Sequence, residues 1–116
     1  MTEGKVIEEV VIGYLNQHLS VPAFAEKPDK EPSKYVLVEK TGGSETDYIE
    51  SAMIAIQSYA DSLISAAKLN KEVKTKMKGI VNLDEIVSAK LVRDYNFTDT
   101  TKKKYRYQAV FSLVHY

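Results

Sequence analysis

The sequence has 116 residues, a length typical of a single domain, and we expect one domain over residues 1–116. Sixteen Lys and Arg residues balance sixteen Asp and Glu residues, so the chain lacks the overall positive charge that drives sequence-independent binding to nucleic acid. There is no cysteine, which excludes disulfides, thiolate metal sites and a cysteine nucleophile.

No apolar run approaches the roughly 20 residues that a membrane-spanning helix requires. The N-terminal residues MTEGKVIEEVV are acidic and amphipathic, without the basic and then apolar layout of a signal peptide. We therefore expect synthesis in the cytoplasm and no membrane partner.

The N-terminal third predicts a helix, a short strand and a loop. Apolar residues recur at three- and four-residue steps between residues 5 and 19, which indicates a helix with one apolar stripe. Residues 21–25 form a short extended segment, and Pro22, which lacks a backbone donor, indicates that this strand is either at a sheet edge or irregular. The charged, proline-containing residues 26–34 predict an exposed loop.

The middle of the chain predicts two strands. Residues 35–41 are rich in β-formers, and their apolar run indicates burial on both faces. Gly42 and Gly43 are expected to end this strand, with residues 42–47, GGSETD, forming a flexible loop. Residues 49–59 suit either a strand or the start of the next helix. We favour a strand that pairs with residues 35–41.

The C-terminal half predicts a long helix and a hairpin. The helix spans residues 60–78, and Gly79 is a suitable stop. Strands are expected at residues 85–95 and 105–116, joined by a polar loop. The predicted fold class is α+β, in the order α-β-β-β-α-β-β, with a mostly antiparallel sheet and helices packed on it.

No catalytic, cofactor-binding or metal-binding residue can be assigned. His18 and His115 lie at opposite ends of the sequence, and neither has a second ligand at metal-binding spacing. The Gly42–Gly43 pair lacks a phosphate-binding motif and is followed by acidic residues. We therefore expect no enzyme activity and no cofactor.

A run of three lysines, Lys102, Lys103 and Lys104, forms a basic tip beside Tyr105 and Tyr107. Basic residues next to aromatics can bind single-stranded nucleic acid. A solvated hairpin tip, with both tyrosines turned towards the core, is the favoured interpretation. A nucleic-acid-binding module that uses this tip stays as the alternative function.

Residues 34–73, KYVLVEKTGGSETDYIESAMIAIQSYADSLISAAKLNKEV, resemble the small tail-completion proteins of long-tailed bacteriophages and prophages, also called tail terminators or head–tail joining proteins. The marks are a hydrophobic strand ending in VEKTGG, then IQSYADS, then an alanine-rich helix. VPAF upstream and RYQAVFSLVHY downstream also fit, so that the resemblance covers roughly residues 15–116.

The resemblance implies a structural virion protein, located in the tail, that assembles as a ring, typically a hexamer. Its partners would be copies of itself, the tail tube protein and the head connector proteins, and the only nucleic acid would be DNA passing through the ring. Another head–tail connector component is the alternative within this class.

Two oppositely charged segments are the candidate interface. The first is acidic and comprises Gly42, Gly43, Ser44, Glu45, Thr46 and Asp47, and the second is the basic run of Lys102, Lys103 and Lys104. Complementary charge orients partners more than it adds affinity. We expect these segments to set the register between subunits or with the tube, the alternative being two ordinary solubilising loops.

Overall fold

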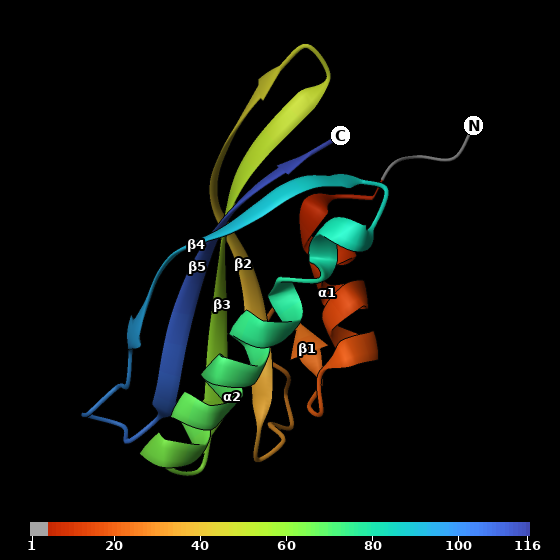
Figure 1. Cartoon of the computed structure of the whole chain (residues 1–116). Coiled ribbons are helices and arrows are strands. Elements are labelled where there is room, and N and C mark those ends of the chain that lie inside the picture. Colours follow the sequence, from red (N-terminus) through yellow and green to blue (C-terminus); the bar gives the residue numbers. More distant parts are fainter. Residues whose placement is uncertain (1–4) are drawn as a thin grey trace.

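The computed structural model describes residues 5–116, and it confirms the α+β fold and the predicted order of helices and strands (Figure 1). The elements are α1 (Ile7–His18), β1 (Ala23–Phe24), β2 (Tyr35–Thr46), β3 (Ile49–Ala60), α2 (Leu63–Met77), the 3-10 helix η1 (Ile80–Asn82), β4 (Ile86–Asn96) and β5 (Tyr105–His115).

The described strands form one five-stranded sheet in the order β1-β2-β3-β5-β4. All neighbours pair antiparallel except β1, which runs parallel to β2 and has registered pairs with Val36 and Leu37. Of the two alternatives for the segment with Pro22, the edge position is therefore confirmed. After β3, helix α2 carries the chain across the sheet to β4, and β5 then folds back between β3 and β4.

Both helices pack on the same face of the sheet, and the core lies between them and the strands (Figure 1). Alternate residues of the three central strands point into this core, as period-two strands require. The residues concerned include Val36 and Val38 of β2, Ile54 and Ile56 of β3, and Ala109, Phe111 and Leu113 of β5. We call the other side of the sheet the open face.

Helix α2 begins later than the sequence predicts. Tyr59 and Ala60 still pair within β3, and Ser62 caps the helix because its hydroxyl accepts from the Ser65 N–H at 3.1 Å. The predicted start at residue 60 is therefore wrong. Cross-strand pairing holds these residues extended until a side chain able to cap the helix is reached.

The C-terminal end of α2 is held by α1. The Tyr14 hydroxyl donates to the Lys76 carbonyl at 2.6 Å, which satisfies one of the carbonyls that a helix end leaves free. Gly79 has an ordinary φ of −87°, so no left-handed turn requires glycine there. A Cβ at this position would instead lie 2.7 Å from the Tyr14 hydroxyl oxygen. Glycine is therefore needed for close packing.

The predicted end of the first long strand is wrong. Gly42 and Gly43 do not stop β2, and residues 42–46 stay paired with β3 as far as the Thr46–Ile49 pair. A bulge between Lys40 and Gly42 leaves Thr41 out of the register, and pairing with β3 continues from Gly42. The expected flexible loop is thus mostly strand, and only Asp47 and Tyr48 form a turn.

Candidate assembly surfaces

The hairpin of β2 and β3 projects beyond the helices, and its outer part is here called the distal hairpin, residues 42–53 (Figure 1). Every residue of β2 from Glu39 to Thr46 is exposed, although the pairing with β3 is maintained. The distal hairpin contains Glu45, Asp47 and Glu50 and no Lys or Arg. The first predicted interface segment therefore lies on a paired, acidic projection.

The turn at the end of this hairpin has an unusual backbone. Asp47 and Tyr48 have φ values of 51° and 70°, in the left-handed region that few residues other than glycine adopt. Positive φ at both central residues suits a two-residue hairpin, because the turn then matches the right-handed twist of the strands. Tyr48 is 89% exposed, so the hairpin ends in an aromatic side chain surrounded by solvent.

Gly43 has a packing role inside the hairpin. A Cβ at this position would lie 2.8 Å from the Ser51 carbonyl oxygen on β3, whereas one at Gly42 would meet nothing within 4 Å. Gly43 therefore allows the two strands to approach closely, and Gly42 carries no such constraint.

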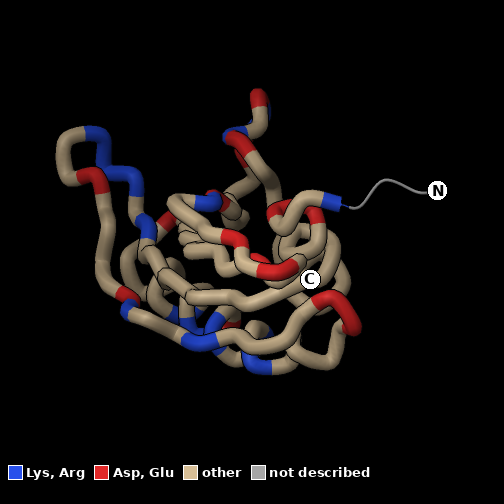
Figure 2. Tube along the Cα trace, turned by 90° about the horizontal axis from the view of Figure 1, so that it is seen from above, with Lys and Arg blue, Asp and Glu red and all other residues tan. Residues whose placement is uncertain are grey.

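The second predicted segment belongs to the loop between β4 and β5, here called the basic loop, residues 97–104. The Asp99 carboxylate accepts from the N–H groups of Thr101 and Lys102 at 3.0 and 3.2 Å. The backbones of Asp99 and Lys104 also form a two-way bridge. Because its own hydrogen bonds close the loop, the lysines project from a defined turn. Figure 2 shows this blue stretch at one margin of the molecule.

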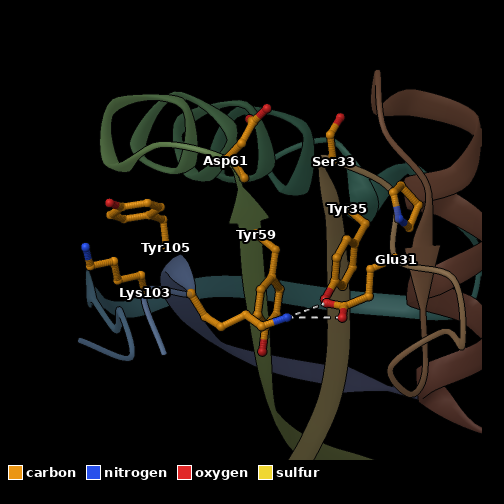
Figure 3. Close-up of a pocket in the computed structure, with 10 residues that line it drawn as sticks. Glu31, Ser33, Tyr35, Tyr59, Asp61, Lys103 and Tyr105 are labelled. Atoms are coloured by element: carbon orange, nitrogen blue, oxygen red, sulfur yellow. Dashed lines mark hydrogen bonds and ion pairs between the residues drawn. The ribbon is translucent and has the colours of Figure 1, made fainter. Parts of the chain in front are cut away.

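The three lysines of the basic loop are not equivalent. Lys104 Nζ lies 3.1 Å from both carboxylate oxygens of Glu31, and the Tyr35 hydroxyl donates to the same carboxylate at 2.6 Å. These contacts tie the loop of residues 26–34 to the basic loop (Figure 3). Lys102 and Lys103 are exposed, so they are the two lysines available to a partner.

The electrostatics of this cluster follow from its hydrogen bonds. The Tyr35 hydroxyl and then the Lys104 ammonium lower the pKa of Glu31, because both stabilise its carboxylate. The same contact raises the pKa of Lys104. Burial, and then the bond to Glu31, raises the pKa of Tyr35. At neutral pH the cluster is therefore an ion pair with a protonated tyrosine.

An aromatic stack lies beside this cluster on the open face. The rings of Tyr35 and Tyr59 are parallel, with centroids 4.7 Å apart. Arg106 lies over the Phe97 ring at 4.3 Å, and it donates to the Phe97 carbonyl at 2.6 Å and to the Tyr59 hydroxyl at 2.8 Å. The cationic and aromatic groups next to the basic loop are therefore engaged with one another.

An open depression of about 370 Å³ lies between these groups (Figure 3). Glu31, Tyr35, Tyr59, Lys103 and Tyr105 are among the residues that line it. The pKa shifts of Glu31, Tyr35 and Lys104 at this depression each favour the ordinary charge state of the group.

The two histidines belong to different elements, His18 to α1 and His115 to β5. The His18 ring packs on Tyr14 with centroids 4.2 Å apart, near the C-terminal end of α1. His115 is buried, and its Nδ1 lies 3.1 Å from the Tyr116 carbonyl. Within residues 5–116, no group of three His, Cys, Asp or Glu residues could hold a metal ion. No described helix is long and apolar enough to cross a membrane.

The acidic and basic segments lie at opposite ends of the sheet. Ile49 begins β3 next to the acidic turn, and Ala60 at the other end of β3 pairs with Tyr105 next to the basic loop. The structure therefore does not bring the two segments together within one chain. If they meet, they do so between different copies.

Sequence reasoning missed three features of these surfaces. The sequence places Glu31 only in an exposed loop, and no local pattern indicates its contact with Lys104. Tyr105 and Tyr107 lie on the same side of β5 as Ala109 and Phe111, as expected, but they are half-buried and outside the core cluster. The long free edges of β2 and β4 follow from the strand order, which the sequence does not contain.

No protein-family model and no curated protein matches this chain.

Proposed function

We propose that this protein is a structural component of a phage tail: a tail terminator that forms a ring, expected to be a hexamer, on the head-proximal end of the tail tube and joins it to the head connector. The activity is geometric and requires no reacting group. Copies of the chain, the tube protein and the connector proteins are the partners, and the site of action is the virion tail.

The observation that carries the proposal is the distal hairpin. Ordering a residue costs about 1–2 kcal/mol of backbone entropy, and the outer part of β2 is held extended by β3 alone, while β3 itself pairs with β5 as far as Glu50–His115. Here β2 pairs along its full length while everything from Glu39 onward is exposed. The outer part of β2 is therefore an ordered but exposed surface, and such a surface is suited to contact with another chain.

The position of the charges gives additional support. The acidic turn and the basic loop lie at opposite ends of a sheet in a molecule about 44 Å long. Where one copy stacks on another or on the tail tube along the strand direction, its acidic end can face a basic end, and opposite charges set the orientation. Lys102 and Lys103 supply the basic side, because Lys104 is paired with Glu31.

The proposal is tested by light scattering and electron microscopy of the purified protein, alone and with tail tubes. We expect rings of tube diameter, either free or on tube ends. The double variant Lys102→Glu/Lys103→Glu should reduce ring formation or tube attachment. The matched control Lys68→Glu/Lys71→Glu changes the same charge on an exposed part of α2 and should behave as wild type. A protein that never binds tubes would contradict the function.

Within the same class, another head–tail connector component remains the alternative, and only the location in the particle separates the two. Immunogold labelling of assembled particles distinguishes the tube end from the connector.

The second candidate function is nucleic-acid binding through Lys102 and Lys103, the two exposed lysines of the basic loop. It receives less support, because Arg106 is held by Phe97 and Tyr59 and is not free to stack on a base. Titration with single-stranded DNA at 50 and 200 mM salt decides between them: salt-sensitive binding lost in Lys102→Glu/Lys103→Glu would favour this candidate.

A further inference from the structure

The described sheet has two long edges without a strand partner. β4 is the last strand in the order, so no described strand pairs with its outer side along Ile86–Asn96. On the opposite side, β1 covers β2 only at Val36 and Leu37, which leaves β2 free from Val38 to Thr46. Free edges present unpaired backbone groups and template the addition of another strand.

The two free edges lie at the same level of the sheet. Following the registered pairs across the sheet, Ser44 is in one row with Ser51, Val114 and Ser88. Four residues further along β3, Ala55 is in line with Glu39, Val110 and Arg93. The row that carries a carboxylate at the β2 edge therefore carries a guanidinium at the β4 edge.

The strand directions match as well. β2 is antiparallel to β3, β3 to β5, and β5 to β4, so β2 and β4 of one chain run in opposite directions. When the β4 edge of one copy approaches the β2 edge of the next in the same orientation, the new pair is antiparallel. The alternation of the sheet is then continued through the contact.

The β4 edge also carries apolar surface. Val87, Leu91 and Val92 are 47%, 46% and 46% exposed. Bulges occur between Ile86 and Ser88 and between Leu91 and Arg93, so the intervening residues form one regular segment. Bulges and charges normally protect an edge strand from pairing with another chain. Here the two bulges bound a short regular segment, residues 88–91, and the charged residue Arg93 lies just beyond it.

We propose that the β4 edge of one copy pairs antiparallel with the β2 edge of a second copy, with Arg93 facing Glu39 of the neighbour. The contact is head-to-tail, since each copy uses a different edge on either side, and such contacts generate closed rings or open helices. The inference rests on the proposed ring function and identifies the surfaces that form the ring.

A charge exchange tests the proposal. Arg93→Glu and Glu39→Arg each place like charges across the contact, and we expect each to raise the concentration for half-maximal assembly about tenfold. The double variant Arg93→Glu/Glu39→Arg restores the pair and should return to within about threefold of wild type. Both residues are exposed, so thermal unfolding serves to show that the monomer fold is unchanged.

Cross-linking supplies an independent measurement, because the chain has no cysteine of its own. In Ser44→Cys/Ser88→Cys the two thiols of one chain are three strand spacings apart, about 14 Å, and cannot bridge within the chain. Directly opposed residues of adjacent strands are close enough. Oxidation should give a ladder of covalent oligomers, whereas neither single variant should cross-link, because its cysteine then faces a serine of the neighbour. A register shifted by two residues gives the ladder in Ser44→Cys/Lys90→Cys instead.

The outcomes separate the inference from the function. Rings that form on tail tubes while neither cysteine pair cross-links, or while the charge exchange fails to restore assembly, overturn edge pairing and leave the tail function standing. Cross-linked oligomers that never bind tail tubes uphold edge pairing and overturn the tail function. A chain that stays monomeric with and without tubes overturns both.

Discussion

Gly79→Ala tests how closely α1 and the end of α2 pack. The added Cβ would lie 2.7 Å from the Tyr14 hydroxyl oxygen, a separation that requires an atom to move. That hydroxyl is held by its hydrogen bond to the Lys76 carbonyl, and burial raises the pKa of Tyr14, so it remains a protonated donor. The clash is therefore not relieved by simple rotation.

The expected magnitude combines two effects. Overpacking of this kind costs about 1–3 kcal/mol. Replacing glycine by alanine at an ordinary φ, here −87°, returns about 0.4–1 kcal/mol by restricting the unfolded chain. We therefore expect Gly79→Ala to lower the free energy of unfolding by about 1–2 kcal/mol, or the Tm by roughly 4–8 °C.

The hydroxyl is identified as the cause by a double-mutant cycle with Tyr14→Phe. Tyr14→Phe alone should cost about 1 kcal/mol through the lost hydrogen bond. Because it also removes the clashing atom, Gly79→Ala should be neutral or stabilising in the Tyr14→Phe background. Urea denaturation followed by circular dichroism measures all four proteins. An equal cost of Gly79→Ala in both backgrounds would refute the reasoning.

Three further predictions concern other contacts. The pKa of Glu31 is lowered below its ordinary value of 4.5, so its carboxylate stabilises the fold above pH 4.5 and loses this contribution as the pH falls through the lowered pKa. The difference in unfolding free energy between wild type and Glu31→Gln should therefore be smaller at pH 3 than at pH 7. Equal differences at the two pH values would contradict this assignment. The side-chain amide of Asn70, a residue that is 2% exposed, donates to the Asp94 carboxylate at 3.1 Å. Asp94→Ala removes this acceptor and should lower the free energy of unfolding, measured by urea denaturation, by about 1–3 kcal/mol. An unchanged free energy would show that the amide finds another acceptor. Ser62→Ala removes the cap of α2 and should cost about 1 kcal/mol, whereas Ser62→Asp should retain most of the stability; equal losses would exclude a capping role.

Local patterns were sufficient for most of the fold. The apolar stripe of α1 and the β-formers that begin β2 each indicate one kind of element, because the spacing of apolar residues reports the helical or strand period. The same reasoning located β3, the strand that could also have been the start of a helix, and gave an edge position as one of two alternatives for the segment with Pro22. It failed at Gly42 and Gly43, where pairing with β3 outweighs the low strand propensity of glycine.

The sequence by itself determined the α+β class, the order of the elements and the separation of acidic and basic segments, since these depend on local spacing and composition. Tertiary structure alone decided that the two charged segments lie at opposite ends of the sheet, that Glu31 holds Lys104, and that Glu39 and Arg93 end the same row on opposite edges. These relations depend on strand order and register, which arise from contacts between residues far apart in the chain.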